Sequence, residues 1–153
     1  MGEPTVYVLS VHDSADGGLS VDLKDLLQAL RGFLSRWTWC IRDLDAAGED
    51  LNGLCQATWE APVWFSSNEL LALSQRVQQT VEGVFLAFPE WLKAAELDPA
   101  ELEVGRFPHS RCELAITAVD SSYFEIYAKD IGCADAIRQH FKDVRLQDPR
   151  VVF

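Results

Sequence analysis

Histidine and cysteine are the residues here from which nucleophilic or metal chemistry would be built, and their spacing favours neither. His12 is followed by Asp13, but adjacent residues of a strand point to opposite sides of a sheet, and no nucleophile is specified beside them. The cysteines form no C-x-x-C motif and have no nearby pair of histidines, so zinc and thioredoxin-type sites lack their ligand spacing. We expect reduced thiols that pack as small apolar groups. They are Cys40, Cys55, Cys112 and Cys133.

Short acidic and glycine-rich stretches match ion-binding motifs only in part. Asp13-x-x-Asp16-Gly17 and Asp43-x-Asp45 offer carboxylates to a hard cation, but neither has the order of acids, glycine and glutamate that an EF-hand requires. Residues 17–20 precede a predicted helix and lack both glycine patterns that bind phosphate. We therefore predict solvated loops, with no metal, no cofactor and no catalytic residue, and we do not expect an enzyme.

Acidic residues alternate with large apolar ones between Asp43 and Trp64, and two interpretations are open. The apolar side chains can be core while the acids solvate a loop. Alternatively, the stretch is a protein-binding surface, in which aromatic anchors become buried and acids steer a basic partner. The outer face of a predicted hairpin has the same composition, unless a second helix layer covers its tyrosines. The candidate binding residues are Asp43, Asp45, Glu49, Asp50, Trp59, Trp64, Tyr123, Glu125 and Tyr127.

Composition and charge limit the class of protein. The chain has 153 residues, 48% of them hydrophobic, and we expect a single domain over residues 1–153. Its 24 acidic and 13 basic side chains leave a net charge of -11, which disfavours nucleic acid and anionic membranes as partners. No apolar run approaches the roughly 20 residues that span a bilayer, and the first residues lack an export signal, so we expect a cytoplasmic protein.

The first third of the chain predicts a strand, a helix and a second strand. Residues 5–11 are rich in β-formers and apolar on both faces. From Ser20, which we expect to be the N-cap, apolar residues follow helical spacing as far as Arg36. Residues 37–42 then form a strand. The two strands would make a right-handed parallel unit if they share a sheet.

The middle of the chain predicts shorter elements. Residues 51–55 can hold a short helix, and residues 66–69 have capping-box spacing that opens a helix to about Gln79. Residues 81–88 should form a strand that Pro89 ends. Residues 98–101 repeat the capping pattern and predict a short surface helix.

A hairpin is predicted over residues 112–129, and side-chain parity determines its register. A three-residue turn at residues 120–122 sets Ile116 opposite Ile126 on the core face, whereas a two-residue turn would set Ile116 opposite Glu125. The same register pairs Thr117 with Glu125 on the other face. Asp130 should then cap a final helix that runs to Phe141.

These elements predict an α+β domain with a mixed, mainly antiparallel sheet of about five or six strands and helices packed on it. The helix that begins at Ser20 should lie on one face. A second copy of the chain would associate near the N-terminus if Val6, Tyr7 and Val8 were not all covered, so both a monomer and a homodimer remain open.

Two segments carry a resemblance to known proteins. Residues 119–130, with the sequence VDSSYFEIYAKD, resemble small acidic bacterial proteins of uncharacterised families, in which a late hairpin leads into a terminal helix. Residues 48–54, GEDLNGL, are similar to the acidic helix by which barstar-type ribonuclease inhibitors meet a basic nuclease. This chain is much longer, and it places a strand at residues 37–42 before that helix. Together these resemblances imply an immunity-type inhibitor.

We therefore expect a non-catalytic acidic protein that binds a basic protein partner, such as an immunity protein that inhibits a basic toxin or nuclease. The alternative is a small enzyme or small-ligand-binding protein with a pocket near His12, Asp13 and Cys40. A flat acidic surface would favour the first hypothesis, and a deep pocket that contains His12 would favour the second.

Overall fold

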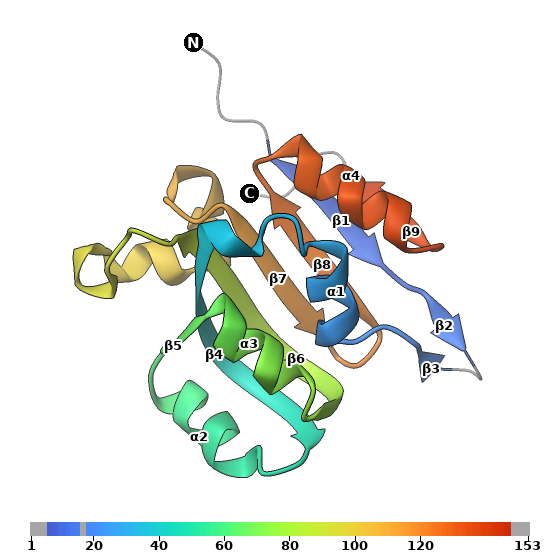
Figure 1. The fold of residues 1–153 in the computed structure, drawn as a ribbon, viewed down its shortest axis with the longest axis horizontal. Coiled ribbons are helices and arrows are strands. Elements are labelled where there is room, and N and C mark those ends of the chain that lie inside the picture. The colour runs from blue at the N-terminus through green and yellow to red at the C-terminus, as the bar shows by residue number, and fades with distance from the viewer. Residues whose placement is uncertain (1–5, 16–17, 148–153) are drawn as a thin grey trace.

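A seven-stranded sheet organises the chain, with the strand order β5-β4-β6-β7-β8-β1-β9 (Figure 1). The computed structural model describes residues 6–15 and 18–147. All neighbouring strands in this sheet are antiparallel. The α+β prediction is confirmed, with slightly more strands than expected. The strands are β1 (Tyr7–Val11), β4 (Trp37–Gly48), β5 (Val63–Ser66), β6 (Val77–Pro89), β7 (Leu114–Val119), β8 (Tyr123–Ala128) and β9 (Val144–Gln147), beside a small ribbon of β2 (Ser14–Ala15) and β3 (Gly18–Leu19).

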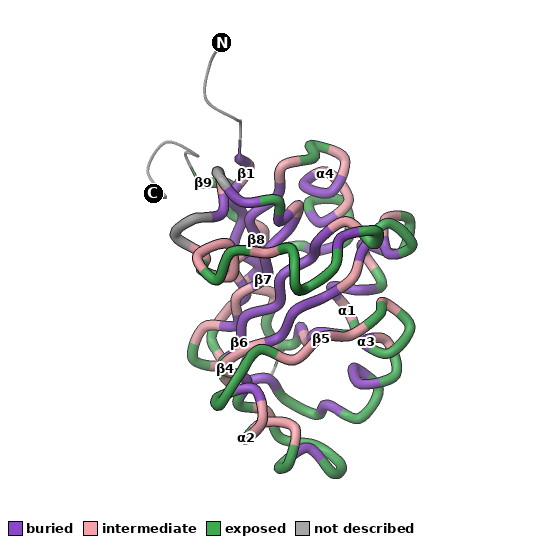
Figure 2. Tube along the Cα trace, turned by 90° about the vertical axis from the view of Figure 1, so that its left-hand side faces the viewer, coloured by how far each residue is buried: buried purple, intermediate pink, exposed green. Residues whose placement is uncertain are grey.

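Three helices cover one face of the sheet and enclose the larger core. Helices α1 (Leu23–Ala29), α3 (Ser67–Ser74) and α4 (Ile131–His140) lie in front of the strands in Figure 1. Helix α2 (Asn52–Glu60) lies beside β4 at the lower end of that view, and a short 3₁₀ turn, η1 (Leu34–Arg36), precedes β4. Trp39, Phe85 and Phe124 are fully buried in this core. Figure 2 shows that the central strands are buried along most of their length, whereas α2 is largely exposed.

The second face of the sheet is partly covered by residues 90–112, which we call the covering segment. It contains three short 3₁₀ helices, η2 (Ala94–Glu96), η3 (Pro99–Leu102) and η4 (Val104–His109). Phe107 and Leu92 from this segment pack with Val8, Phe88 and Tyr127 of the sheet in a second, smaller core. We therefore infer that the covering segment takes the place of a second helix layer.

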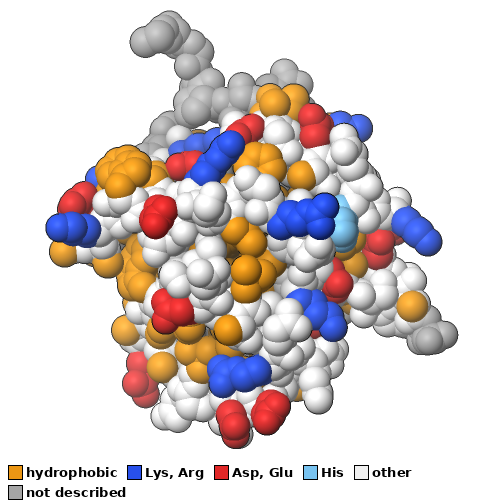
Figure 3. Space-filling model, viewed as in Figure 1, with side chains coloured by type: hydrophobic (Ala, Val, Ile, Leu, Met, Phe, Trp, Pro, Cys, Tyr) orange, Lys and Arg blue, Asp and Glu red, His pale blue; other side chains and the backbone are white. Residues whose placement is uncertain are grey.

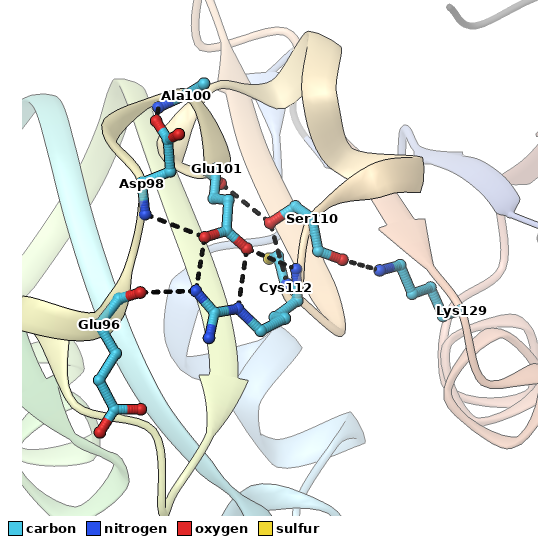
Figure 4. A network of polar contacts seen from close by, with 8 residues as sticks. Glu96, Asp98, Ala100, Glu101, Ser110, Cys112 and Lys129 are labelled. Atoms are coloured by element: carbon cyan, nitrogen blue, oxygen red, sulfur yellow. Dashed lines mark hydrogen bonds and ion pairs between the residues drawn. The ribbon is translucent and has the colours of Figure 1, made fainter.

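An ion pair holds the covering segment together (Figure 4). Glu101 accepts hydrogen bonds from Arg111 Nε at 3.0 Å and from an Nη of the same guanidinium at 2.8 Å. The Asp98 N–H also donates to this carboxylate, and Arg111 reaches the Glu96 carbonyl at 2.7 Å. The hydrogen bonds from Arg111 hold the pKa of Glu101 at about 2. Lys129, the residue directly after β8, donates to the Ser110 carbonyl and ties the segment to the end of that strand.

Helix α1 begins later and ends earlier than predicted. Asp22, not Ser20, is the N-cap, and the helix stops at Ala29 rather than continuing to Arg36. A contact far away in sequence explains the start, because the Asp22 carboxylate also accepts from the Thr80 hydroxyl at 2.7 Å and from the Thr80 N–H. Asp25 completes a capping box by accepting from the Asp22 N–H.

Strands β4 and β6 are longer than predicted because they pair along most of their length. Helix α3 has the predicted Ser66 to Glu69 capping box but ends at Ser74, and Val77 already belongs to β6. The strands meet closely at Gly48, where an added Cβ would lie 2.1 Å from the Arg76 carbonyl oxygen. Strands β1 and β4 share the sheet and run in the same direction, but β8, β7 and β6 separate them, so they are not paired.

The predicted hairpin register is confirmed. Ile116 lies opposite Ile126 and Thr117 lies opposite Glu125. In the turn, Asp120 and Ser121 have φ of 52° and 58°. Asp130 caps α4 as predicted, since its side chain accepts from the Gly132 N–H, and the capping box at Asp98 and Glu101 is also present.

The remaining expectations about loops and ends have mixed outcomes. Gly18 and Leu19 form β3 of the small ribbon, while Asp16 and Gly17 lie outside the described residues. Val6 and Val8 are 3% and 0% exposed within this chain, whereas Tyr7 between them is only half-buried. The three residues are therefore not all covered, and association with a second copy near the N-terminus stays a prediction. Across the described part of the chain, no helix is long and apolar enough to cross a membrane.

Candidate functional site

A row of aligned residues crosses the second sheet face next to the covering segment. Arg42 of β4 lies opposite Val84 of β6, which lies opposite Thr117 of β7. Thr117 lies opposite Glu125 of β8, and Glu125 lies opposite Ser10 of β1. Because directly opposite residues of paired strands project to the same face, this register brings segments far apart in the sequence onto one surface.

A cavity of about 500 Å³, widely open to solvent, lies at the β4 end of this row. Its polar and aromatic lining comes from Asp43, Trp59, Glu82, Thr117 and Asp120. These residues belong to β4, α2, β6, β7 and the turn between β7 and β8, respectively. We call this cavity the Trp59 pocket. The remaining lining is small or aliphatic and consists of Gly83, Val84, Ala118 and Val119.

The position of Trp59 follows from how α2 packs on β4. Leu51 and Leu54 of this segment pack against the larger core, whereas the Trp59 side chain leaves that face and is 55% exposed. Its indole Nε1 donates to the Leu44 carbonyl at 2.9 Å. The Leu44 N–H in turn donates to the Thr58 hydroxyl at 3.0 Å. Both hydrogen bonds join α2 to β4, so the indole is held in place although it is exposed.

An irregularity in β4 brings Asp43 to the pocket. Asp43 has φ of 54°, and the pairing with β6 shifts register between Arg42 and Asp45. Leu44, between the two acids, remains 1% exposed in the larger core. Arg42 donates from one Nη to Asp43 and from Nε to the Leu102 carbonyl at 2.9 Å, so its guanidinium connects the pocket rim to the covering segment.

The other carboxylates of this surface have no cation as partner among the described residues. Within the described residues, the side chains of Glu82 and Asp120 have neither an ion-pair nor a hydrogen-bond partner. Asp45 lies directly opposite Glu82, an arrangement of like charges that destabilises a pair of strands. Glu125 accepts a hydrogen bond from the Tyr127 hydroxyl, and its partial burial raises its pKa.

Thr117 adds an unsatisfied hydroxyl to the pocket lining. Its Oγ1 is buried and has no hydrogen-bond partner in the part of the chain that the structure describes. Buried polar groups in folded proteins are nearly always paired, so an orphaned one needs an explanation. The hydroxyl and the carboxylates of Glu82 and Asp120 leave the pocket with acceptors that none of the described residues uses.

Five of the nine predicted binding residues lie in or beside the Trp59 pocket. Asp43 and Trp59 line the pocket itself. The other three are aligned with pocket residues across the strands, Asp45 with Glu82, Glu125 with Thr117 and Tyr123 with Val119. The structure thus joins the acidic stretch after Asp43 to the outer hairpin face.

The other four predicted residues lie elsewhere. Glu49 and Asp50 are exposed in the turn between β4 and α2. Trp64 packs against Phe88 at a ring distance of 5.5 Å, in the second core. Tyr127 is 7% exposed and lies 6.0 Å from the Phe107 ring of the covering segment. Tyr127 is therefore covered, as the alternative interpretation of the hairpin face predicted. Tyr123 instead stacks on His12.

Sequence reasoning did not select Glu82, Thr117 or Asp120. The sequence contained one indication for Thr117, because the predicted hairpin register places it opposite the predicted binding residue Glu125. Glu82 lies in a predicted strand, but its neighbours across β4 and β7 depend on pairings that no local pattern reveals. Asp120 had been assigned only to the hairpin turn.

The structure does not bring His12, Asp13 and Cys40 together. Three strands separate β1 from β4, which at the usual strand spacing is a distance of about 19 Å. The Asp13 carboxylate accepts from the N–H groups of Lys142 and Asp143, and His12 shares a hydrogen bond of 2.8 Å with the Ser10 hydroxyl. Burial raises the pKa of the Cys40 thiol to about 12. These contacts are structural.

The cysteines and acids of the described chain show no metal-binding arrangement. All four cysteines are free, and Cys40, Cys112 and Cys133 are buried. Burial raises the pKa of the Cys112 and Cys133 thiols to about 12, which suppresses the reactive thiolate. No group of three or more His, Cys, Asp or Glu side chains among the described residues is arranged to hold a metal ion.

Comparison with known proteins identifies the family. Residues 20–152 match the family described as "Protein of unknown function (DUF2691)". Searches of the curated proteins and of the solved structures found no match. Because the family match covers most of the sequence, the chain belongs to DUF2691.

Proposed function

We propose that this member of the DUF2691 family is a non-catalytic protein that binds a basic partner protein through the Trp59 pocket and the acids around it. One observation carries the proposal. An exposed tryptophan and three carboxylates, those of Asp43, Glu82 and Asp120, line the same cavity. An aromatic ring next to carboxylates is the environment that favours an ammonium or guanidinium group.

The energetics of the surface support a charged partner. Asp45 and Glu82 repel each other across β4 and β6, and a cation placed between them would remove this cost. Trp59 supplies a fixed aromatic surface that a partner can bury, which is typical of residues that dominate an interface. The net charge of -11 would accelerate the approach of a basic protein.

A narrower proposal concerns the identity of the partner. The exposed Glu49 and Asp50 immediately before α2 occupy the segment that resembles a nuclease-binding helix, and they suit a basic toxin or nuclease. Four free cysteines are consistent with the cytoplasm, which we propose as the location. If the narrower proposal holds, this chain should inhibit a basic toxin domain that is encoded beside it. A toxin that stays fully active when this chain is in excess would contradict it.

Isothermal titration with short peptides tests the broader proposal. A peptide rich in Lys and Arg should bind, whereas a peptide with Glu in the same positions should not. Trp59→Ala should weaken binding about thirtyfold, the effect of removing an interface anchor worth about 2 kcal/mol. Trp91→Ala is the matched control, because Trp91 is 74% exposed but lies in the covering segment, outside the pocket. Failure of the basic peptide to bind, or equal losses in the two variants, would contradict the proposal.

A further inference from the structure

We infer that the Trp59 pocket accepts an arginine side chain of the partner in preference to a lysine, an inference that rests on the proposed function. Four features of the pocket are relevant: a fixed indole, carboxylates on three different elements, a hydroxyl with no partner among the described residues, and an otherwise small or aliphatic lining. Each has a different consequence for the two basic side chains.

The distribution of acceptors favours a planar donor with several N–H groups. Asp43 comes from β4, Glu82 from β6 and Asp120 from the turn after β7. A guanidinium has five N–H donors in a fixed plane, whereas a lysine ammonium is a compact group with three. Acceptors on separate elements are therefore matched better by arginine.

Thr117 provides an acceptor that does not depend on charge. Its Oγ1 is buried and has no partner in the described residues, and the residue itself lines the pocket. Because this oxygen is closed off from solvent, a guanidinium N–H would satisfy it only after the Thr117 side chain rotates towards the pocket, while other N–H groups reach the carboxylates. The unpaired hydroxyl thus indicates a bound donor, independently of the acidic residues.

The indole and the aliphatic lining of the pocket also discriminate between the two cations. The Trp59 ring is held by its hydrogen bond to the Leu44 carbonyl and remains 55% exposed. Val84 and Val119 contribute aliphatic surface to the same pocket. A guanidinium stacks on an aromatic ring and is more weakly hydrated than an ammonium, so it loses less hydration in a pocket of this kind.

The chain contains its own example of this chemistry at the pocket rim. Arg42 donates simultaneously to the Asp43 carboxylate and to the Leu102 carbonyl. Its guanidinium occupies one side of Asp43, whereas Glu82 and Asp120 have no cation among the described residues. The position for the partner's arginine is therefore between Trp59, Glu82, Asp120 and Thr117.

The test compares three short peptides that differ at one position, which is arginine, lysine or citrulline. Citrulline has the shape of arginine without its charge. We expect the arginine peptide to bind about tenfold more tightly than either of the others. Glu82→Gln, Asp120→Asn and Thr117→Val should each weaken binding of the arginine peptide severalfold and reduce its advantage over lysine. Glu60→Gln is the control, because Glu60 is exposed beside Trp59 in sequence but does not line the pocket.

The outcomes separate this inference from the proposed function. Equal affinities for the arginine and lysine peptides would overturn the arginine preference and leave a basic-partner surface in place. An unchanged arginine preference in all three pocket variants would show that another surface binds, and would also overturn it. If no basic peptide binds, the proposed function fails and the inference fails with it. Thermal melting of each variant establishes that a lost affinity is not lost folding.

Discussion

The buried hydroxyl of Thr117 should lower the stability of the folded chain. Its Oγ1 is the buried side-chain oxygen for which the described residues offer no partner. Because an unpaired buried hydroxyl costs free energy, Thr117→Val should raise the free energy of unfolding by about 1 kcal/mol. Urea denaturation measures this change. A variant less stable than the parent would show that the hydroxyl is already hydrogen-bonded in solution and is therefore not available to a bound partner.

Asp22 combines a local contact, the cap of α1, with a contact to a residue distant in sequence. Its carboxylate caps α1 and accepts two hydrogen bonds from Thr80. Asp22→Ala should therefore lower the free energy of unfolding by about 2 to 3 kcal/mol, the sum of a lost cap and an unsatisfied Thr80.

Ser20→Ala is the control for the Asp22 variant. Ser20 is exposed and was the N-cap predicted from the sequence, but it does not cap the helix in the structure. Its replacement should change stability by less than about 0.5 kcal/mol. Equal losses in the two variants, measured by the same denaturation experiment, would contradict the observed start of α1.

At the scale of elements, the covering segment depends on the pair of Glu101 and Arg111. The pKa of Glu101 lies at about 2, below its ordinary value of 4.5. The pair therefore stabilises the folded segment fully above pH 4.5, and this contribution is lost as the pH falls towards 2. In the variant Glu101→Gln, the free energy of unfolding should lack this loss between pH 4.5 and about 2.

Thiol labelling measures how firmly the covering segment is held. Cys112 is 1% exposed in the second core, so a maleimide reaches it only when the segment opens. Glu101→Gln should accelerate labelling of Cys112 at neutral pH. Glu103→Gln, at an exposed residue of the same segment, should leave the rate unchanged. Equal rates in the parent and in Glu101→Gln would show that the ion pair does not hold the segment.

The elements that sequence reasoning predicted correctly are those determined by local chemistry. The hairpin register followed from parity around residues 120–122, and the caps at Ser66 and Asp130 followed from side chains within three residues of the helix start. The start of α1 and the extension of β6 to Val77 depend on partners distant in sequence, so local patterns misplaced them. The covering segment has no periodicity that would predict a layer.

The candidate site shows the same division. The types of its residues were visible in the sequence, and Trp59, Asp43 and Glu125 were predicted as binding residues. Their positions around Thr117 on one surface depend on the pairings of β4 with β6 and of β6 with β7, and no local spacing in the sequence encodes these pairings. The strand order also separates His12 from Cys40, which the sequence alone left free to share a pocket.

At the scale of the whole molecule, the negative charge should determine the association rate of a basic partner, and Trp59 should determine its dissociation rate. On the helix side, acidic side chains are visible at the lower end of the molecule, where α2 lies (Figure 3). Charge reversal of Asp45, Glu49 and Asp50 should slow association with a basic peptide and weaken its salt dependence. Trp59→Ala should instead accelerate dissociation. Stopped-flow kinetics separates the two rates, and identical effects of both changes would contradict this division.

The measurement that tests the central claim most directly is a nuclear magnetic resonance titration of the isotope-labelled protein with an arginine-containing peptide. The indole N–H of Trp59 gives its own signal, and its chemical environment is known from the hydrogen bond to Leu44. We expect this signal and the backbone signals of Glu82, Thr117 and Asp120 to shift together, while that of the Trp91 indole stays in place. Shifts confined to other parts of the chain would contradict the claim that the Trp59 pocket is the binding surface.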